Sequence, residues 1–379
     1  MKVTSLELEN FRNIPSARIE PCAGVNVIFG ENAQGKTNLL EAMWLCSCGK
    51  SFRGARESQM IRFGEKAFRI GLSFADRQRE QQLSYHSSGS GRKVRLNGVP
   101  LKTAAELAGE FLSVVFSPSD LSIVQEGPAA RRAFLDNAIS QIKPVYAKYL
   151  QQYNSILEQR SALLKEIALH GRLAASTLEI WDQQLAQMGT AISIFRRDYL
   201  TKLSEVAEKV YGGFSGFQES FSLQYESSVF SADRELKVYS GELIAEYMAV
   251  LAENLENDIR MRSTGKGIHR DDLDMKVNGL SVRSFGSQGQ QRSCAIALKI
   301  GEAMLLKGVT GEDPVILLDD VMSELDQGRQ DYLLNRIKNF QVFITCCDIV
   351  GALRMKEGKV FRMEEGRVRE VPPEELGIM

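Results

Sequence analysis

The sequence lacks several features that would assign it to a class at once. Its six cysteines include no Cys-x-x-Cys pair, which favours free thiols in a reducing compartment over disulfides or zinc. The first residues lack the apolar core of a signal peptide, and no apolar run is long enough to span a bilayer. We therefore expect a cytoplasmic protein with no structural metal and no membrane partner.

Net charge of one sign is also missing. The 47 Lys and Arg residues nearly balance the 48 Asp and Glu residues, so the composition does not indicate a nucleic-acid partner. Any anion binding must come from local patches. The sequence has no internal repeat and no low-complexity tract, and its 379 residues are enough for two or three domains.

Hydrophobic patterns divide the chain into three parts. Up to about residue 120, short apolar runs such as Val25–Phe29 alternate with turns, and Asn97-Gly98 predicts a hairpin. From Pro128 to Arg262 the spacing is helical, interrupted by a Phe- and Gly-rich stretch at 212–230 whose composition is compatible with strands. After residue 262, two apolar runs are typical of strands buried on both faces: Val315–Leu318 and Gln341–Cys347. We predict an α/β head built from residues 1–127 and 263–379, with a mainly helical insertion over 128–262.

A phosphate-binding loop follows the first of these strands. Residues 30–37 match G-x-x-x-x-G-K-[ST] in full, between a strand and an amphipathic helix, which is the context that the motif requires. Backbone N–H groups and the helix N-terminus bind phosphate oxygens, Lys36 reaches the β- and γ-phosphates, and Thr37 holds Mg²⁺. The predicted ATP-binding residues of this loop are Gly30, Glu31, Asn32, Ala33, Gln34, Gly35, Lys36 and Thr37.

Carboxylates that complete such a site follow a later strand. Asp319 ends the apolar run and is the predicted second Mg²⁺ ligand. Asp320 lies where a general base would polarise the attacking water. The alternative interpretation of Asp320 is a surface acid at the end of the strand. Because aspartate is one methylene shorter than glutamate, we expect slow hydrolysis.

Ser287-Gln288-Gly289-Gln290 begins a further helix. A hydroxyl, exposed N–H groups and the helix dipole together make an anion site, although a serine here also serves as an ordinary N-cap. The order of phosphate loop, Ser-x-Gly-Gln, acidic strand and Ser323-x-Leu-Asp resembles the ABC-type ATPases. That resemblance implies two heads joined head to tail, with Ser287, Gly289 and Gln290 closing over the γ-phosphate bound by the partner.

Further motifs narrow the resemblance. Glu9-Asn10-Phe11-Arg12-Asn13 is similar to an SMC-head motif whose basic residue, here Arg12, contacts nucleotide. The chain as a whole resembles the bacterial RecF family, on four further motifs together with the phosphate loop. These motifs are FSPSDL from Phe116, Gly127 to Asp136, GIHRDDL from Gly267, and Ser287 to Arg292.

The resemblance implies an ATP-dependent DNA-binding protein of replication, recombinational repair and SOS induction, with weak, DNA-stimulated ATP hydrolysis. Its expected partners are single-stranded DNA, gapped or junction duplexes, a second copy of the chain on ATP binding, and RecR and RecO. The sequence departs from the wider superfamily after Thr345, where no histidine is present to sense the γ-phosphate. His269 has two interpretations, an ATP-site residue or a structural one, and the role of 117–120 is open.

Basic residues cluster after the phosphate-loop helix, at Lys50, Arg53, Arg56 and Arg62. Spacing alone favours a solvated charged face, whereas the family resemblance favours contacts to DNA phosphates. Another basic run, Arg92, Lys93 and Arg95, lies near the predicted hairpin.

Two other functions share parts of this pattern. An ABC-type nucleotide-binding subunit of a transporter would need a shorter path from phosphate loop to Ser287. A nucleotide-gated scaffold with incidental hydrolysis remains open.

Overall fold

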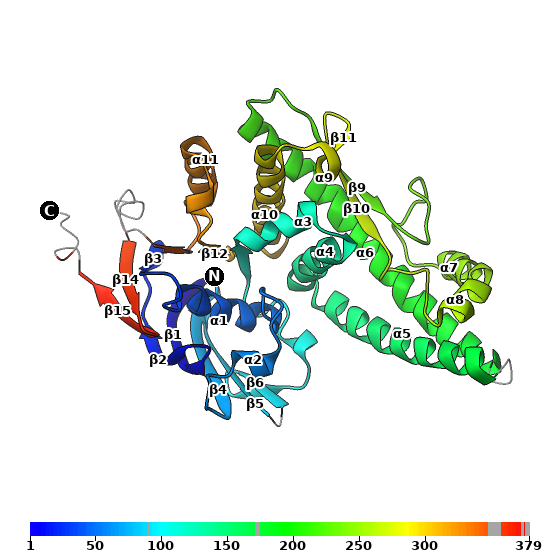
Figure 1. Ribbon diagram of the computed structural model, residues 1–379, viewed down its shortest axis with the longest axis horizontal. Helices are drawn as coiled ribbons and strands as arrows, with labels where there is room; N and C mark the ends of the chain where they lie inside the picture. Colours follow the sequence, from blue (N-terminus) through cyan, green and yellow to red (C-terminus); the bar gives the residue numbers. More distant parts are fainter. Residues whose placement is uncertain (90, 171–174, 348–357, 373–374, 376–379) are drawn as a thin grey trace. The chain divides into compact units, whose positions relative to one another are not determined.

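The computed structural model describes residues 1–379 except 90, 171–174, 348–357, 373–374 and 376–379 (Figure 1). The chain divides into two compact units, residues 1–121 with 295–379 and residues 122–294. Each is described by itself. None of the described helices is long and apolar enough to cross a membrane.

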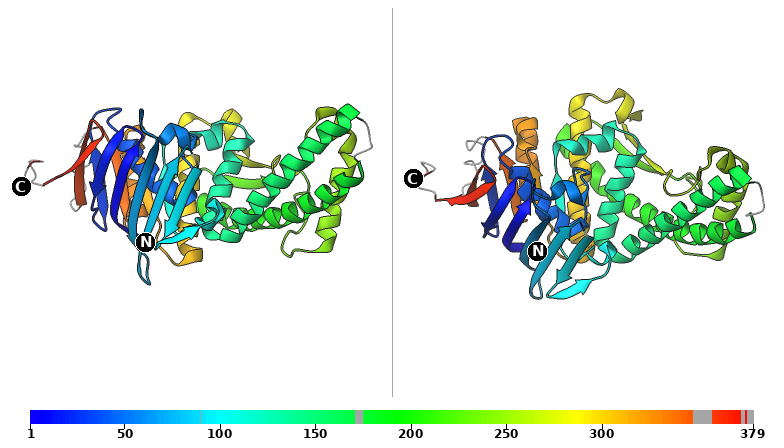
Figure 2. Two further views of the ribbon diagram at one scale, coloured as in Figure 1. Left: turned by 90° about the horizontal axis from the view of Figure 1, so that it is seen from below. Right: turned by 60° about the horizontal axis from the view of Figure 1, so that its bottom comes forward.

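The first unit contains an antiparallel sheet of six strands in the order β2-β1-β4-β5-β6-β7. Figure 2 shows its blue and cyan strands side by side. The predicted turn at Asn97-Gly98 is confirmed, since both residues have positive φ and Leu96 pairs with Val99. The strands are β1 (Lys2–Phe11), β2 (Ile14–Ile19), β4 (Ala67–Ala75), β5 (Glu80–Ser88), β6 (Gly91–Leu96) and β7 (Val99–Leu101).

A second, mixed sheet of the same unit has the order β15-β14-β3-β13-β12-β8. All neighbours are parallel except β15 with β14. The two apolar runs after the helical region are confirmed as the buried strands β12 and β13. The strands are β3 (Val25–Phe29), β8 (Ser113–Phe116), β12 (Val315–Asp319), β13 (Val342–Cys346), β14 (Gly358–Glu364) and β15 (Arg367–Val371).

The helix α1 (Lys36–Cys48) shares one core with both sheets. Its residues Leu39 to Cys46 are apolar or buried on nearly every side, as expected of a helix enclosed by other elements. Most of α10 (Gln288–Thr310) also belongs to this unit, together with α2 (Glu57–Met60) and α11 (Gln327–Ile337). Short 3₁₀ turns lie at Ala104–Glu106, Pro118–Asp120 and Met322–Glu324.

The second unit is mainly helical. α5 (Pro144–His170) and α6 (Ala175–Ser215) lie alongside each other (Figure 1), and the 41 residues of α6 extend about 60 Å. A three-stranded sheet, β11-β10-β9, includes a strand within the stretch 212–230. The other elements are α3 (Leu121–Gln125), α4 (Pro128–Ile142), β9 (Phe221–Glu226), α7 (Gly241–Glu253), α8 (Leu255–Met261), β10 (Asp272–Val277), β11 (Leu280–Ser281) and α9 (Val282–Phe285).

The boundary between the units differs from the expected one. Residues 263–294 belong to the helical unit rather than to the head. The reason is pairing over long sequence distances: β10 pairs with β9, and Arg131 on α4 forms a bidentate ion pair with Asp272. The boundary falls within α10 (Gln288–Thr310), whose first residues belong to the helical unit.

Candidate nucleotide site

The backbone of the phosphate loop depends on its two glycines. A Cβ at Gly30 would lie 2.2 Å from the carbonyl oxygen of Met363. Gly35 has a φ of 114°, and a Cβ there would lie 2.6 Å from Oδ1 of Asn13. Ala33 also has a positive φ, of 65°. The loop is therefore a close-fitting turn that leads from β3 into α1, and the sequence pattern anticipated its place in the fold.

Lys36 is turned back onto the loop. Its Nζ donates to the carbonyl oxygens of Gly30, at 2.6 Å, and Glu31, at 2.8 Å. The side chain is 7% exposed. Since loop carbonyls are its hydrogen-bond acceptors, an anion entering the loop offers this ammonium a stronger, charged acceptor.

Thr37 and Asp319 meet although 282 positions separate them in the sequence. Thr37 Oγ1 donates to Asp319 Oδ1 at 2.8 Å, and Thr345 Oγ1 donates to the same oxygen at 2.9 Å. Burial raises the pKa of Asp319, while these two hydroxyl donors oppose that rise. A hydroxyl and a carboxylate oxygen, both of them Mg²⁺ ligand types, thus converge at one point.

Asp320 has a φ of 54°, a left-handed conformation unusual for a residue other than glycine. Its backbone N–H donates to Thr345 Oγ1 at 2.9 Å. Ser323 Oγ lies 3.3 Å from Oδ1 of Asp320, as a donor. Thr345 therefore links both aspartates, a role that the sequence did not indicate because nothing marks a threonine on a buried strand.

These residues border a pocket of about 320 Å³ in the first unit. It is lined by residues 32–38 together with Asn13, Arg53, Asp320 and Thr345. Asn13 and Asn38 were not predicted. Asn13 donates to the carbonyl of Ala33 at 3.2 Å and accepts from Asn38 at 2.8 Å, so the pair braces the loop.

Arg12, predicted to contact nucleotide, does not line this pocket. Its guanidinium forms a bidentate ion pair with Glu41 of α1, at 2.9 and 2.7 Å, and donates to the carbonyl of Gln59. Glu41 is fully buried. The observed role of Arg12 is to neutralise a buried carboxylate next to the loop.

The basic residues predicted to contact DNA have different environments. Lys50, Arg53 and Arg56 are exposed, whereas Arg62 is half-buried and lies 4.0 Å from Glu65. Arg53 donates to Asn38 at 3.2 Å, which brings it to the edge of the nucleotide pocket.

The Ser287 segment lies in the helical unit. Ser287 Oγ accepts from the N–H of Gln290 at 3.2 Å, and the Gln290 side chain accepts from the N–H of Ser287 at 2.8 Å. This reciprocal pair is a capping box. Ser287 is exposed and Gly289 is half-buried at the first turn of α10.

His269 is held by hydrogen bonds within the helical unit. Its Nδ1 lies 2.8 Å from the hydroxyl of Tyr153 and its Nε2 lies 2.9 Å from the carbonyl of Thr264. Burial lowers the pKa of His269 to about 4. The following Asp271 contacts Arg196 and Tyr225, so the motif supports the core of this unit.

The segment 117–120 has a capping role in the first unit. The backbone N–H of Ser117 donates to the Oδ2 atom of Asp120 at 2.7 Å. Burial raises the pKa of Asp120, and the positive charge of the nearby Lys299 on α10 opposes this rise. Lys299 pairs with Glu302 in the same buried cluster.

The family model for the RecF/RecN/SMC N terminal domain matches residues 2–367. The DNA replication and repair protein RecF of Clostridioides difficile (strain 630) is 40% identical over 372 residues, 97% of this chain and 98% of its own. The protein of that name from Ruminiclostridium cellulolyticum is 39% identical over 373 residues, 97% of this chain and 99% of its own.

Solved structures also resemble this chain in fold. A structure of the recombination mediator protein RecF with ATP, in the RecFOR pathway, superposes with a TM-score of 0.90 at 37% identity, covering 98% of both chains. An Smc head domain from Pyrococcus furiosus has a TM-score of 0.55 at 15% identity, covers 99% of this chain and 98% of its own, and supports the fold alone. The predicted fold class is confirmed: an ABC/SMC-type ATPase head from both chain ends with a mainly helical insertion.

Proposed function

The chain belongs to the RecF family of DNA replication and repair proteins, and from that premise we propose that it is an ATP-dependent DNA-binding protein reset by slow ATP hydrolysis. It would dimerise on ATP binding at single-strand gaps or junctions, supporting recombinational repair, replication restart and SOS induction. RecR and RecO are the proposed partners, in keeping with the RecFOR pathway named for the ATP-bound relative.

The observation that carries the proposal is the convergence of Thr37 and Asp319 beside the phosphate loop. The close packing of the loop also requires its two glycines, because a Cβ at Gly30 or Gly35 would collide with neighbouring protein atoms. Mg²⁺, when bound, neutralises charge on the phosphates. Thr37 and Asp319 would hold it, and Lys36 would exchange its loop carbonyls for phosphate oxygens.

Asp320 is the proposed general base. It lines the pocket, and its backbone is fixed by Thr345. A carboxylate at that position can accept a proton from water within hydrogen-bond reach. Arg12 would have to give up its ion pair with Glu41 before it could contact the nucleotide. The ion pair with Glu41 therefore supports a role for Arg12 in fixing the position of α1.

Ser287, Gly289 and Gln290 are the proposed contacts to the γ-phosphate bound by a second copy. The exposed serine at a helix start supports this, because such a position presents N–H groups and the positive end of the helix dipole. ATP would then favour the dimer through its preferential binding to that state.

DNA binding is proposed for Lys50, Arg53, Arg56 and Arg62. Binding of a gapped duplex, followed by fluorescence anisotropy with ATP, ADP or no nucleotide, tests the function directly. We expect tighter binding with ATP than with ADP; equal affinity in all three states would contradict ATP-dependent binding. A non-hydrolysable analogue should support binding but slow release, whereas equal release rates would leave hydrolysis incidental.

The basic segment is tested by the double variant Lys50→Ser/Arg56→Ser. Loss of two phosphate contacts should reduce the slope of log affinity against log salt by about 1.5 to 2. The matched control, Lys338→Ser/Arg367→Ser, removes the same charge from two other exposed positions. If both double variants change the slope equally, the segment makes no specific contact.

A further inference from the structure

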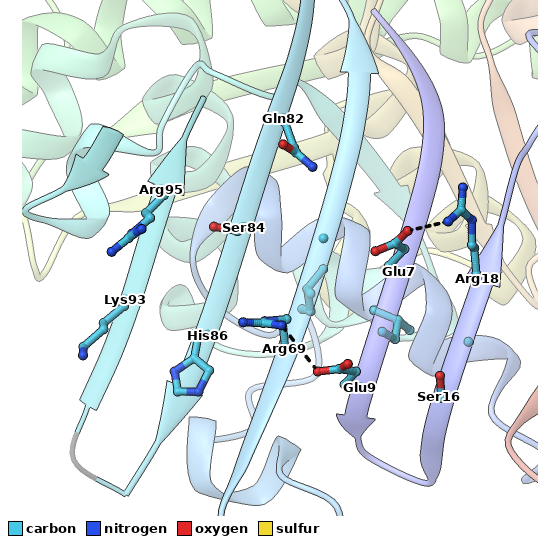
Figure 3. Close-up of a pocket in the computed structure, with 14 residues that line it drawn as sticks. Glu7, Glu9, Ser16, Arg18, Arg69, Gln82, Ser84, His86, Lys93 and Arg95 are labelled. Carbon is cyan, nitrogen blue, oxygen red and sulfur yellow. Dashed lines mark ion pairs between the residues drawn. The ribbon is translucent and has the colours of Figure 1, made fainter. Parts of the chain in front are cut away.

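The outer face of the antiparallel sheet carries two rows of polar side chains that cross its strands (Figure 3). The strand registers put these residues opposite one another from β2 to β6. One row is Ser16, Glu9, Arg69, His86 and Lys93, and the other is Arg18, Glu7, Gly71, Ser84 and Arg95.

A hollow of about 690 Å³ lies along these rows. Its floor is low because Gly71 and Ser84 are short residues between the longer Glu7 and Arg95 of the same row. A Cβ at Gly71 would make only ordinary contacts with Glu7, at 3.6 Å or more, so close packing does not require the glycine. The hollow is thus open space on a rigid sheet.

The charges of the hollow are compensated on one side only. Toward β1 and β2, Glu7 pairs with Arg18 at 3.1 Å and Glu9 lies 3.8 Å from Arg69 (Figure 3). Toward β5 and β6, the side chains of His86, Lys93 and Arg95 make no ion pair or hydrogen bond within the described part of the chain.

The strand register leaves this basic side without facing carboxylates. Lys93 is opposite His86, and Arg95 is opposite Ser84, so neither cation has an acidic residue across from it. Opposite charges in facing positions would stabilise the strand pair, and here they are missing. Arg92, in the same sequence run, points to the other face, where it pairs with Glu57. The uncompensated charge therefore gathers specifically in the hollow.

We propose that the hollow is the docking site of an acidic peptide segment from a partner protein. Lys93 and Arg95 are two residues apart on β6, and such side chains are separated by about 7 Å. An extended peptide presents alternate side chains at the same spacing. Carboxylates on alternate residues of a peptide running along β6 would therefore face both cations.

The lining favours a peptide over a nucleic acid. Glu7 and Glu9 lie one strand from Gly71 and Arg69 and repel any anionic chain that crosses the sheet, which limits an acidic segment to a path along β6. The lining contains no Phe, Tyr or Trp, and the imidazole of His86 is its one ring, so successive bases would have no row of rings on which to stack. Charges of both signs, in contrast, fix the register of a bound peptide.

The test measures fluorescence anisotropy of a labelled dodecapeptide of alternating glutamate and serine with the full chain, and its glutamine-serine counterpart as the neutral probe. Replacing Lys93 and Arg95 by serine should weaken binding of the acidic peptide roughly tenfold. The matched control, Lys338→Ser/Arg367→Ser, should leave it unchanged. Thermal melts establish that each variant is folded.

A second variant separates shape from charge. Gly71→Leu fills the floor of the hollow without changing any charge, and its φ does not require glycine. It should weaken the acidic peptide severalfold while leaving a dT oligonucleotide unaffected. The proposal is overturned if Lys93→Ser/Arg95→Ser and its control weaken peptide binding equally, or if Gly71→Leu has no effect on it. It is also overturned if the variants of the hollow reduce oligonucleotide binding more than peptide binding.

Discussion

The phosphate-loop region of the first unit and the buried charge network of the second use polar residues in opposite ways. Among the residues that the structure describes, Lys36 donates only to neutral acceptors, and the hydroxyls of Thr37 and Thr345 share one oxygen of Asp319. In the helical unit, each buried guanidinium has charged partners: Arg160 contacts Asp182 and Asp258.

Arg196 extends this network. It donates to Asp136, Tyr146 and the carbonyl of Ile268, and lies 3.5 Å from Asp271. The two regions differ in the charge of the partners of their buried polar groups, and this difference separates groups that are available for function from groups that stabilise the fold. Groups with weak acceptors remain available to a charged ligand, whereas groups with charged, buried partners hold the fold together.

The largest expected effect is on stability, from Arg196→Met. It leaves Asp136 and Asp271 without their cation, so the free energy of unfolding should fall by about 3 to 5 kcal/mol. Denaturant titration measures this change. The control Arg18→Met replaces an exposed residue whose ion pairs lie on the surface, and it should leave the free energy of unfolding close to the wild-type value. Equal losses of unfolding free energy in the two variants would show that the buried network stabilises the fold no more than surface ion pairs do.

His269 should make the helical unit sensitive to acid. Its pKa is about 4 in the folded protein, below the ordinary value of 6.5, so the neutral form is favoured by folding. This contribution is complete above pH 6.5 and is lost as the pH falls toward 4, amounting to about 3 kcal/mol at most. The difference in unfolding free energy between the wild type and His269→Gln should therefore shrink over that range. A difference independent of pH would contradict the buried neutral histidine.

Lys36→Arg should act on turnover and spare stability. The planar guanidinium does not replace the compact ammonium between phosphates, and we expect roughly 100-fold slower ATP hydrolysis, about 3 kcal/mol. Steady-state phosphate release measures the rate, and denaturant titration should give a wild-type midpoint. Hydrolysis at the wild-type rate would remove the ATP site from this loop.

Asp320→Asn should slow single-turnover hydrolysis by about tenfold or more while Mg²⁺-dependent ATP binding persists through Asp319. The ATP-bound state, and DNA complexes with it, should then last longer. Unchanged single-turnover rates would assign the base to another residue, with Glu324 the next to test.

The smallest effect expected is at Ser287. Ser287→Ala removes the N-cap of α10 and should cost about 1 kcal/mol of stability. Ser287→Asn keeps a capping side chain but replaces the hydroxyl. Sedimentation with ATP and with ADP distinguishes the two roles: a γ-phosphate contact predicts weaker ATP-driven dimerisation in both variants. Normal dimerisation of Ser287→Asn would leave the serine as a helix cap only.

The sequence by itself determined the phosphate loop, the acidic strand and the two-ended head. These features depend on local rules: a glycine pattern between a strand and a helix, and apolar runs long enough for buried strands. Residues 30–37 and Asp319 could be predicted because their neighbours along the chain define them.

Only the tertiary structure decided which distant side chains meet. It brought Thr345 to both aspartates, gave Arg12 to Glu41, and moved residues 263–294 into the helical unit through the pairing of β10 with β9. It also turned Lys93 and Arg95 to the opposite face from Arg92. Such outcomes depend on strand register and on the partners of buried charges, which residues far apart in sequence fix together.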